Sequence, residues 1–165
     1  MAGKEIENII HQIEIGYETL DVVLRNTTES QLWNSPGGDD WSPSQIMGHV
    51  IEMGPFWASR VSEVAEKGIE LRTDRNPSEA TARFAAVDKY SKASLAVIRR
   101  DLIQSKERCV ERIATLQDAD LEVQRRSGDQ ETTLRDFLES HIVLHLQEHA
   151  EQMSGPKGTE EPSGS

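Results

Sequence analysis

The sequence predicts an all-α protein built as a four-helix bundle. Four long segments repeat apolar residues at three- and four-residue steps, which is the period of an amphipathic helix. None of the segments alternates apolar and polar residues as a half-buried strand does. The chain has 165 residues, enough for one domain with a sizeable core. We expect a single domain over residues 1–154, followed by a disordered tail over 155–165, whose polar composition cannot bury anything.

The first predicted helix covers residues 4–25. Its apolar stripe consists of Ile6, Ile9, Ile10, Ile13, Tyr17, Leu20, Val23 and Leu24. His11 falls off this stripe, beside two glutamates, and we interpret it as a surface histidine. A capping box at Thr28 and Gln31 predicts a short turn in the connection that follows.

The second helix has the clearest start signal in the chain. Ser42 is the N-cap, Pro43 occupies the first helical position and Gln45 completes a capping box. The predicted stripe ends before Gly68, a C-terminal stop, and consists of Ile46, Val50, Met53, Trp57, Val61 and Val64. His49 lies on the flank of that stripe. It is either a core-edge histidine with one hydrogen bond or a side chain that reaches a neighbouring helix.

Residues 69–87 form a long, weakly patterned connection, in which Asn76 and Pro77 predict the start of a short helix. A connection of this length can span the bundle, so helices two and three need not be antiparallel neighbours. The third helix is predicted over 88–116. Cys109 lies on its apolar stripe, which favours a small buried residue over a reactive thiol. Residues 117–132 are predicted to be a polar linker with a turn at Ser127.

The fourth helix, residues 134–153, carries His141, His145 and His149, spaced four apart, and Thr133 caps it. A four-residue spacing places the three rings on one helix face. Phe137, Leu138 and Leu144 predict that this face looks inward. The nitrogens of a buried imidazole need a hydrogen-bond partner or a metal ion, so a bound metal ion would explain histidines on an inward face. The alternative is a solvated helix face that happens to carry histidines.

Composition excludes several classes of function. The net charge of −11 disfavours nucleic acid and anionic membranes as partners. No segment is apolar for long enough to span a membrane, and the N-terminus lacks the pattern of a secretory signal. The single cysteine cannot form an internal disulfide, which fits a reducing compartment. We therefore expect a cytoplasmic protein.

Two motifs resemble the DinB/YfiT-like family of metalloenzymes. WSPSQIMGHVIEM, residues 41–53, is similar to the family's second helix, where a Trp-Ser pair precedes a metal-binding histidine. TLRDFLESHIVLHLQEHAEQM, residues 133–153, is similar to its fourth helix, where two histidines four apart are followed by a glutamine. The matching positions are His49, His145, His149 and Gln152.

The resemblance implies a four-helix bundle with a long crossover, a divalent metal held by His49, His145 and His149, and a homodimer. Three histidines leave one coordination position open for water or substrate. Zinc and nickel both suit imidazole. His141 is a further candidate, either as a competing ligand or as a catalytic group. As catalytic groups, His141 and Glu148 could each accept the released proton or orient a ligand imidazole. Glu148 is otherwise a surface residue.

The resemblance leaves two classes of function. The first is a metal-dependent enzyme that adds a low-molecular-weight thiol to an electrophile, a thiol-dependent S-transferase, or that carries out a hydrolysis. Its partner would be a small-molecule substrate. The second is a non-catalytic, stress-related bundle that binds a metal or a ligand. A purely structural protein would not explain histidines on an inward face.

Overall fold

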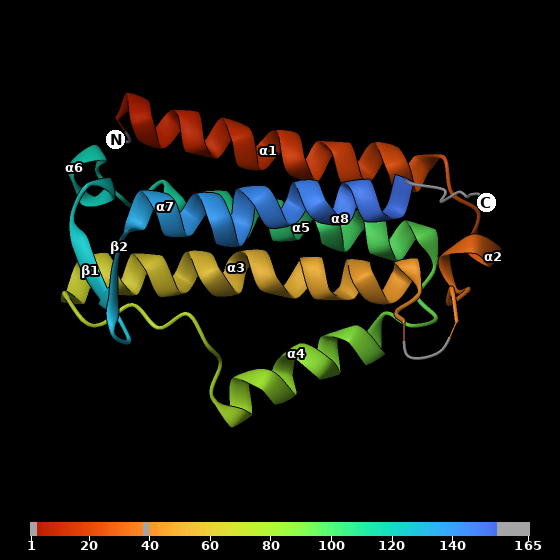
Figure 1. Cartoon of the computed structure of the whole chain (residues 1–165). Helices are drawn as coiled ribbons and strands as arrows, with labels where there is room; N and C mark the ends of the chain where they lie inside the picture. The colour runs from red at the N-terminus through yellow and green to blue at the C-terminus, as the bar shows by residue number, and fades with distance from the viewer. Residues whose placement is uncertain (1–2, 38–39, 155–165) are drawn as a thin grey trace, which may run out of the picture.

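Four long helical segments form the bundle, which confirms the predicted fold class (Figure 1). The computed structural model describes residues 3–37 and 40–154. The segments are α1 (Lys4–Arg25), α3 (Pro43–Lys67), α5 (Leu95–Ile113) and a last helix made of α7 (Leu134–Leu138), η1 (Glu139–Val143) and α8 (Leu144–Ser154). The predicted tail over 155–165 lies outside the described residues.

The bundle has a crossover topology, as the resemblance implied. In Figure 1, α3 and α5 run in the same direction, opposite to α1 and to the last helix. The two parallel helices pack against each other, and α1 packs against both α5 and α8. A parallel pair needs a connection that returns along the bundle, and residues 68–94 make this crossover.

The crossover contains more helix than the sequence predicted. α4 (Pro77–Lys89) is capped by Asn76, and α5 begins only at Leu95, after the cap Ser94, and not at Asp88. α4 lies against α3 at Gly48, where a Cβ atom would come within 2.7 Å of the Ala86 carbonyl oxygen. Glycine at this position therefore lets the two backbones approach.

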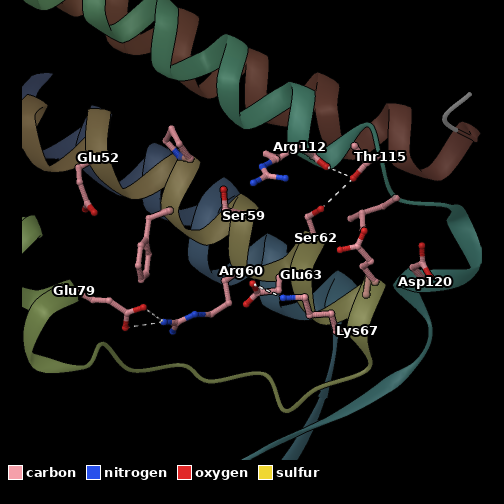
Figure 2. Close-up of a pocket in the computed structure, with 15 residues that line it drawn as sticks. Glu52, Ser59, Arg60, Ser62, Glu63, Lys67, Glu79, Arg112, Thr115 and Asp120 are labelled. Atoms are coloured by element: carbon pink, nitrogen blue, oxygen red, sulfur yellow. Dashed lines mark hydrogen bonds and ion pairs between the residues drawn. The ribbon is translucent and has the colours of Figure 1, made fainter.

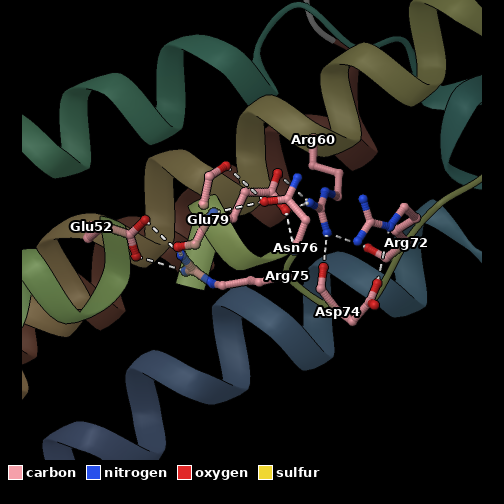
Figure 3. Close-up of polar contacts among 8 residues, drawn as sticks. Glu52, Arg60, Arg72, Asp74, Arg75, Asn76 and Glu79 are labelled. Carbon is pink, nitrogen blue, oxygen red and sulfur yellow. Dashed lines mark hydrogen bonds and ion pairs between the residues drawn. The ribbon is translucent and has the colours of Figure 1, made fainter. Parts of the chain in front are cut away.

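Two arginine–glutamate pairs fasten the crossover to α3 (Figure 3). Arg75 binds Glu52 with both ends of its guanidinium, at N–O distances of 2.7 and 2.9 Å. Arg60 binds Glu79 with a single guanidinium nitrogen, Nη2, which donates to both carboxylate oxygens at 2.9 Å each. Two-point pairs fix orientation as well as distance, so the start of α4 is held in one position on α3.

The structure confirms both predicted ends of the second long helix, α3, and the short turn predicted before it. Ser42 and Gln45 form a reciprocal capping box at the start of α3, and Gly68 ends it with a left-handed φ of 67°. Thr28 and Gln31 form the same kind of box around α2 (Glu29–Leu32). The six residues of the predicted α3 stripe are all buried.

The predicted polar linker is partly ordered. It contains α6 (Asp118–Leu121) and an antiparallel hairpin, β1 (Gln124–Ser127) and β2 (Gln130–Thr133). The turn lies where it was predicted, with Gly128 at φ 66°. A two-residue turn needs positive φ, which glycine adopts at low cost, and this is what closes the hairpin.

A π turn in the last helix corrects one prediction. η1 inserts an extra residue between α7 and α8. The apolar face therefore continues through Ile142, Leu146 and Ala150, which are buried, whereas Leu144 is 47% exposed. The histidines lie beside that apolar face and are half-buried, not in the centre of the core.

Within the described residues, none of the helices combines the length and the apolar character that a membrane crossing requires.

Candidate metal centre

Three imidazole rings meet in the seam between α3 and α8. The ring of His49 lies 5.1 Å from that of His149 and 6.0 Å from that of His145, measured between centroids. The two rings on α8 are 5.4 Å apart. The structure thus brings together the three histidines that the motifs singled out, from helices nearly a hundred residues apart in the sequence.

Hydrogen bonds fix the tautomers of the two histidines on α8. His145 donates from Nδ1 to the carbonyl oxygen of His141 at 3.2 Å, and His149 donates from Nδ1 to Oε1 of Gln152 at 3.1 Å. Both acceptors are oxygens that cannot donate, so each Nδ1 carries the hydrogen. When these rings are neutral, each Nε2 therefore presents a lone pair, as a metal ligand must.

Two nitrogens of the cluster are buried without a hydrogen-bond partner among the described residues. They are Nδ1 of His49 and Nε2 of His149. A buried polar atom without a partner costs free energy, so it needs an explanation. A bound ion would explain the unpartnered Nε2 of His149. Because Nδ1 carries the hydrogen, Nε2 is the nitrogen with a lone pair for a metal ion.

The spacing of the rings fits one ion. Metal–nitrogen bonds of about 2 Å in tetrahedral geometry would put imidazole centroids about 5 Å apart. The observed separations are 5.1 to 6.0 Å. Over residues 3–37 and 40–154, however, no group of three or more His, Cys, Asp or Glu side chains is already arranged to hold a metal ion. The distances between the rings are therefore close to those in a three-histidine metal site. The nitrogen atoms, however, are not yet arranged around one common point.

The surroundings keep His49 and His149 uncharged at neutral pH. Burial is the main cause that lowers the pKa of His49 to about 3, followed by the charges of His149 and Arg83. Burial also lowers the pKa values of His141 and His149. At neutral pH these rings are therefore neutral, which is the form that binds metals.

The lowered pKa values make stability depend on pH. A histidine in an unfolded chain has a pKa of about 6.5, so below that pH the unfolded chain binds protons that native His49 excludes down to about pH 3. The free energy of unfolding of the chelator-treated protein should therefore fall as pH falls from 6.5 toward 3. In His49→Gln the slope should be smaller by on the order of 1 kcal/mol per pH unit. Urea unfolding at several pH values measures this, and equal slopes would contradict it.

His141 lies beside the cluster and not in it. Its ring stacks on Phe137 at 4.0 Å and meets Trp57 edge-on at 5.2 Å, while Nδ1 bonds to Ser140 Oγ at 2.9 Å. Its main-chain oxygen accepts the hydrogen bond from Nδ1 of His145. The structure therefore connects His141 to the site through its backbone.

Glu148 and Glu52, each one turn from a clustered histidine or its neighbours, differ in their surroundings. Glu148 is exposed on α8, and its charge raises the pKa of His149, so it lies close enough to act on that ring. Glu52 is paired with Arg75. His11 is exposed, and Cys109 is fully buried, as predicted, with a pKa that burial raises to about 12.

Two residues near the site were not predicted. Trp41 lies with its ring centroid 5.6 Å from that of His49, and the guanidinium of Arg83 lies 5.6 Å from the Trp41 ring. The position of Trp41 just before the helix that carries His49 was a signal for it. Nothing in the sequence marked Arg83, since α4 brings it there through the crossover.

A large groove of about 840 Å³ lies along another part of α3 (Figure 2). Its lining includes Arg60, Glu79, Ser62 and Thr115, and none of the three clustered histidines. A smaller cavity of about 670 Å³ lies between the crossover and the hairpin, and its lining includes His141. Neither of these two spaces is lined by His49, His145 or His149.

Comparison with known families decides the relationship. The sequence model of the DinB superfamily matches residues 12–153, which reach from within α1 to the last turn of α8. The chain belongs to the DinB superfamily. No curated protein matches the sequence.

Solved structures show the DinB fold at low sequence identity. A mycothiol-dependent maleylpyruvate isomerase is 12% identical over 91% of this chain and 61% of its own, with a TM-score of 0.69. An uncharacterised Clostridium difficile 630 protein is 14% identical over 94% and 96%, with a TM-score of 0.68. YfiT from Bacillus subtilis, titled a probable metal-dependent hydrolase with an unusual four-helix bundle topology, is 19% identical over 92% and 89%, with a TM-score of 0.63. The present chain spans about three fifths of the isomerase.

Proposed function

We propose that this DinB protein is a metal-dependent enzyme whose divalent ion, zinc or nickel, is held by His49, His145 and His149. One observation carries the proposal. Three imidazoles from two helices are spaced as the ligands of one ion, and Nε2 of His149 is buried without a partner among the described residues. Three ligands leave a coordination position open, as catalytic sites do.

The chain's own residues would prepare the ligands. Gln152 and the main-chain oxygen of His141 accept from the Nδ1 atoms and so fix which nitrogen faces the ion. A divalent ion bound there would supply a Lewis acid that lowers the pKa of a water or thiol. Glu148, whose charge acts on His149, is proposed to take the released proton.

We propose S-transfer as the reaction, with a low-molecular-weight thiol as co-substrate. The likeness to a mycothiol-dependent isomerase supports a thiol, and the likeness to a probable metal-dependent hydrolase supports an activated water. In the addition the S–H bond breaks and its proton passes to Glu148, while the sulfur forms a bond to the electrophilic carbon of a double bond. The π electrons of that double bond move to the neighbouring atom, which then takes up a proton from Glu148 or water. The homodimer stays a prediction, which the mass in solution would test.

Activity should depend on the metal and on Glu148. A panel of small thiols with an electrophile, with hydrolysable esters and amides as the parallel assay, should show turnover that a chelator abolishes and zinc or nickel restores. Glu148→Gln should keep its metal and lose about 100-fold in kcat, since general base catalysis contributes about that much. Thiol transfer that persists under chelation would contradict the proposal, and turnover in the ester assay alone would replace S-transfer by hydrolysis.

A further inference from the structure

Buried nitrogens without partners gather at one place in the structure. The described residues contain four such side-chain nitrogens, and three of them belong to His49, His149 and Arg83. The fourth is Nε of Arg125, on β1. Two of the three belong to the histidine cluster, but a metal ion cannot satisfy the third, because a guanidinium is a cation that only donates.

Arg83 reaches the cluster from α4. Its guanidinium lies 5.6 Å from the centroid of Trp41, whose ring is 5.6 Å from His49. The charge of Arg83 contributes to lowering the pKa values of both His49 and His149. α4 can carry it there because Gly48 lets the two helices approach.

The pairing of Arg83 differs from that of Arg60 and Arg75. Arg60 and Arg75 each form an ion pair with a glutamate. Arg83 takes part in no salt bridge with any other described residue. In a chain with a net charge of −11, this leaves one unpaired positive charge beside the three imidazoles. A divalent ion would add to that positive charge, and the charge of exposed Glu148 acts against it at His149.

We propose that Arg83 binds a carboxylate of the substrate, so that the trihistidine site takes small carboxylate-bearing molecules. This inference rests on the proposed function, because the carboxylate is assigned to a molecule that also reaches the ion. The planar guanidinium matches a carboxylate with two parallel hydrogen bonds. An anion there satisfies the buried Nε and offsets the positive charge of the site in one contact.

A matched pair of thiol series tests the assignment in the full-length protein loaded with cobalt. Mercaptoacetate, mercaptopropionate and mercaptobutyrate are compared with mercaptoalcohols of the same lengths, and thiolate–cobalt absorption reports binding. One chain length should let the thiolate reach the cobalt ion while the carboxylate reaches Arg83. At that length the acid should bind about tenfold more tightly than the alcohol, as expected for a charged hydrogen-bonded pair. Arg83→Gln should reduce this ratio to about one. Arg125→Gln, which removes the other unpartnered Nε, should leave it unchanged.

The result separates the role of Arg83 from that of the metal. A preference for acids that survives in Arg83→Gln, or no preference in the wild type, would overturn the assignment even if cobalt binds. If the protein binds no cobalt, the metal proposal fails, and propionate is then titrated against propanol while the NMR signal of the Arg83 Nε–H group is followed. A shift with propionate alone supports the carboxylate site, and the absence of a shift refutes it.

Discussion

Replacing His149 with Ala is expected to lower the affinity for zinc or nickel at least about 100-fold, more than the loss of a group that only orients a ligand. The reason is the position of Nε2, which is buried and has no other partner among the described residues. His49→Ala should have the same effect, because it removes the only ligand that α3 contributes. Metal content after dialysis, measured by elemental analysis, should fall from about one ion per chain to near zero.

Two histidines serve as controls. His11→Ala should keep the full metal content, because that side chain is exposed on α1. His141→Ala should also keep it, since its main-chain oxygen still holds His145 after the ring is removed. The loss of the stack on Phe137 should instead lower stability by about 1 kcal/mol. Equal metal retention in His49→Ala, His149→Ala and His11→Ala would refute the site.

Gly54→Ala should destabilise the fold by about 3 kcal/mol, because it combines overpacking with damage to a buried hydrogen bond. A Cβ atom at Gly54 would lie 2.0 Å from the hydroxyl oxygen of Tyr17, which is buried and hydrogen-bonded to Ser105 at 2.9 Å. Ser105 in turn donates to the carbonyl oxygen of Ile51, so the tyrosine has little freedom to move. The midpoint of thermal unfolding should fall by about 10 °C.

Two variants check the cause of this effect. Tyr17→Phe removes the clashing oxygen, so Gly54→Ala should cost clearly less in that background than in the wild type. Gly68→Ala should cost only about 1 kcal/mol, the strain of its left-handed backbone, because no atom lies within 4 Å of a Cβ there. If the cost of Gly54→Ala were the same in both backgrounds, the clash with the tyrosine would not be its source.

The helices were predictable wherever local chemistry determines them. The start of α3 depends on Ser42, Pro43 and Gln45 alone, which are adjacent in the sequence. The start of α5 was misplaced because Tyr90 is buried as a residue of a helix stripe would be, although residues 90–94 lie between α4 and α5. The hairpin was missed because its strands are polar, so they show no alternation. The crossover was favoured only by the family resemblance.

The histidine cluster was predictable in its members and less so in its geometry. His49, His145 and His149 come together as their motifs suggested. A regular helix predicted an inward Leu144, but the π turn rotates the later residues, and a π turn leaves no clear pattern in a sequence. Arg83 was beyond prediction because its position depends on how α4 lies across α3.

The seam between α3 and α8 has a consequence for how the molecule opens. The contacts of α3 with α5 are more extensive than its contacts with α8, and at the latter seam imidazoles replace the apolar side chains that fill a core. Local unfolding begins where few apolar contacts hold two elements together. In the metal-free protein, α3 and α8 should therefore separate before the other helices do. A bound ion would link these two distant parts of the chain and oppose that separation.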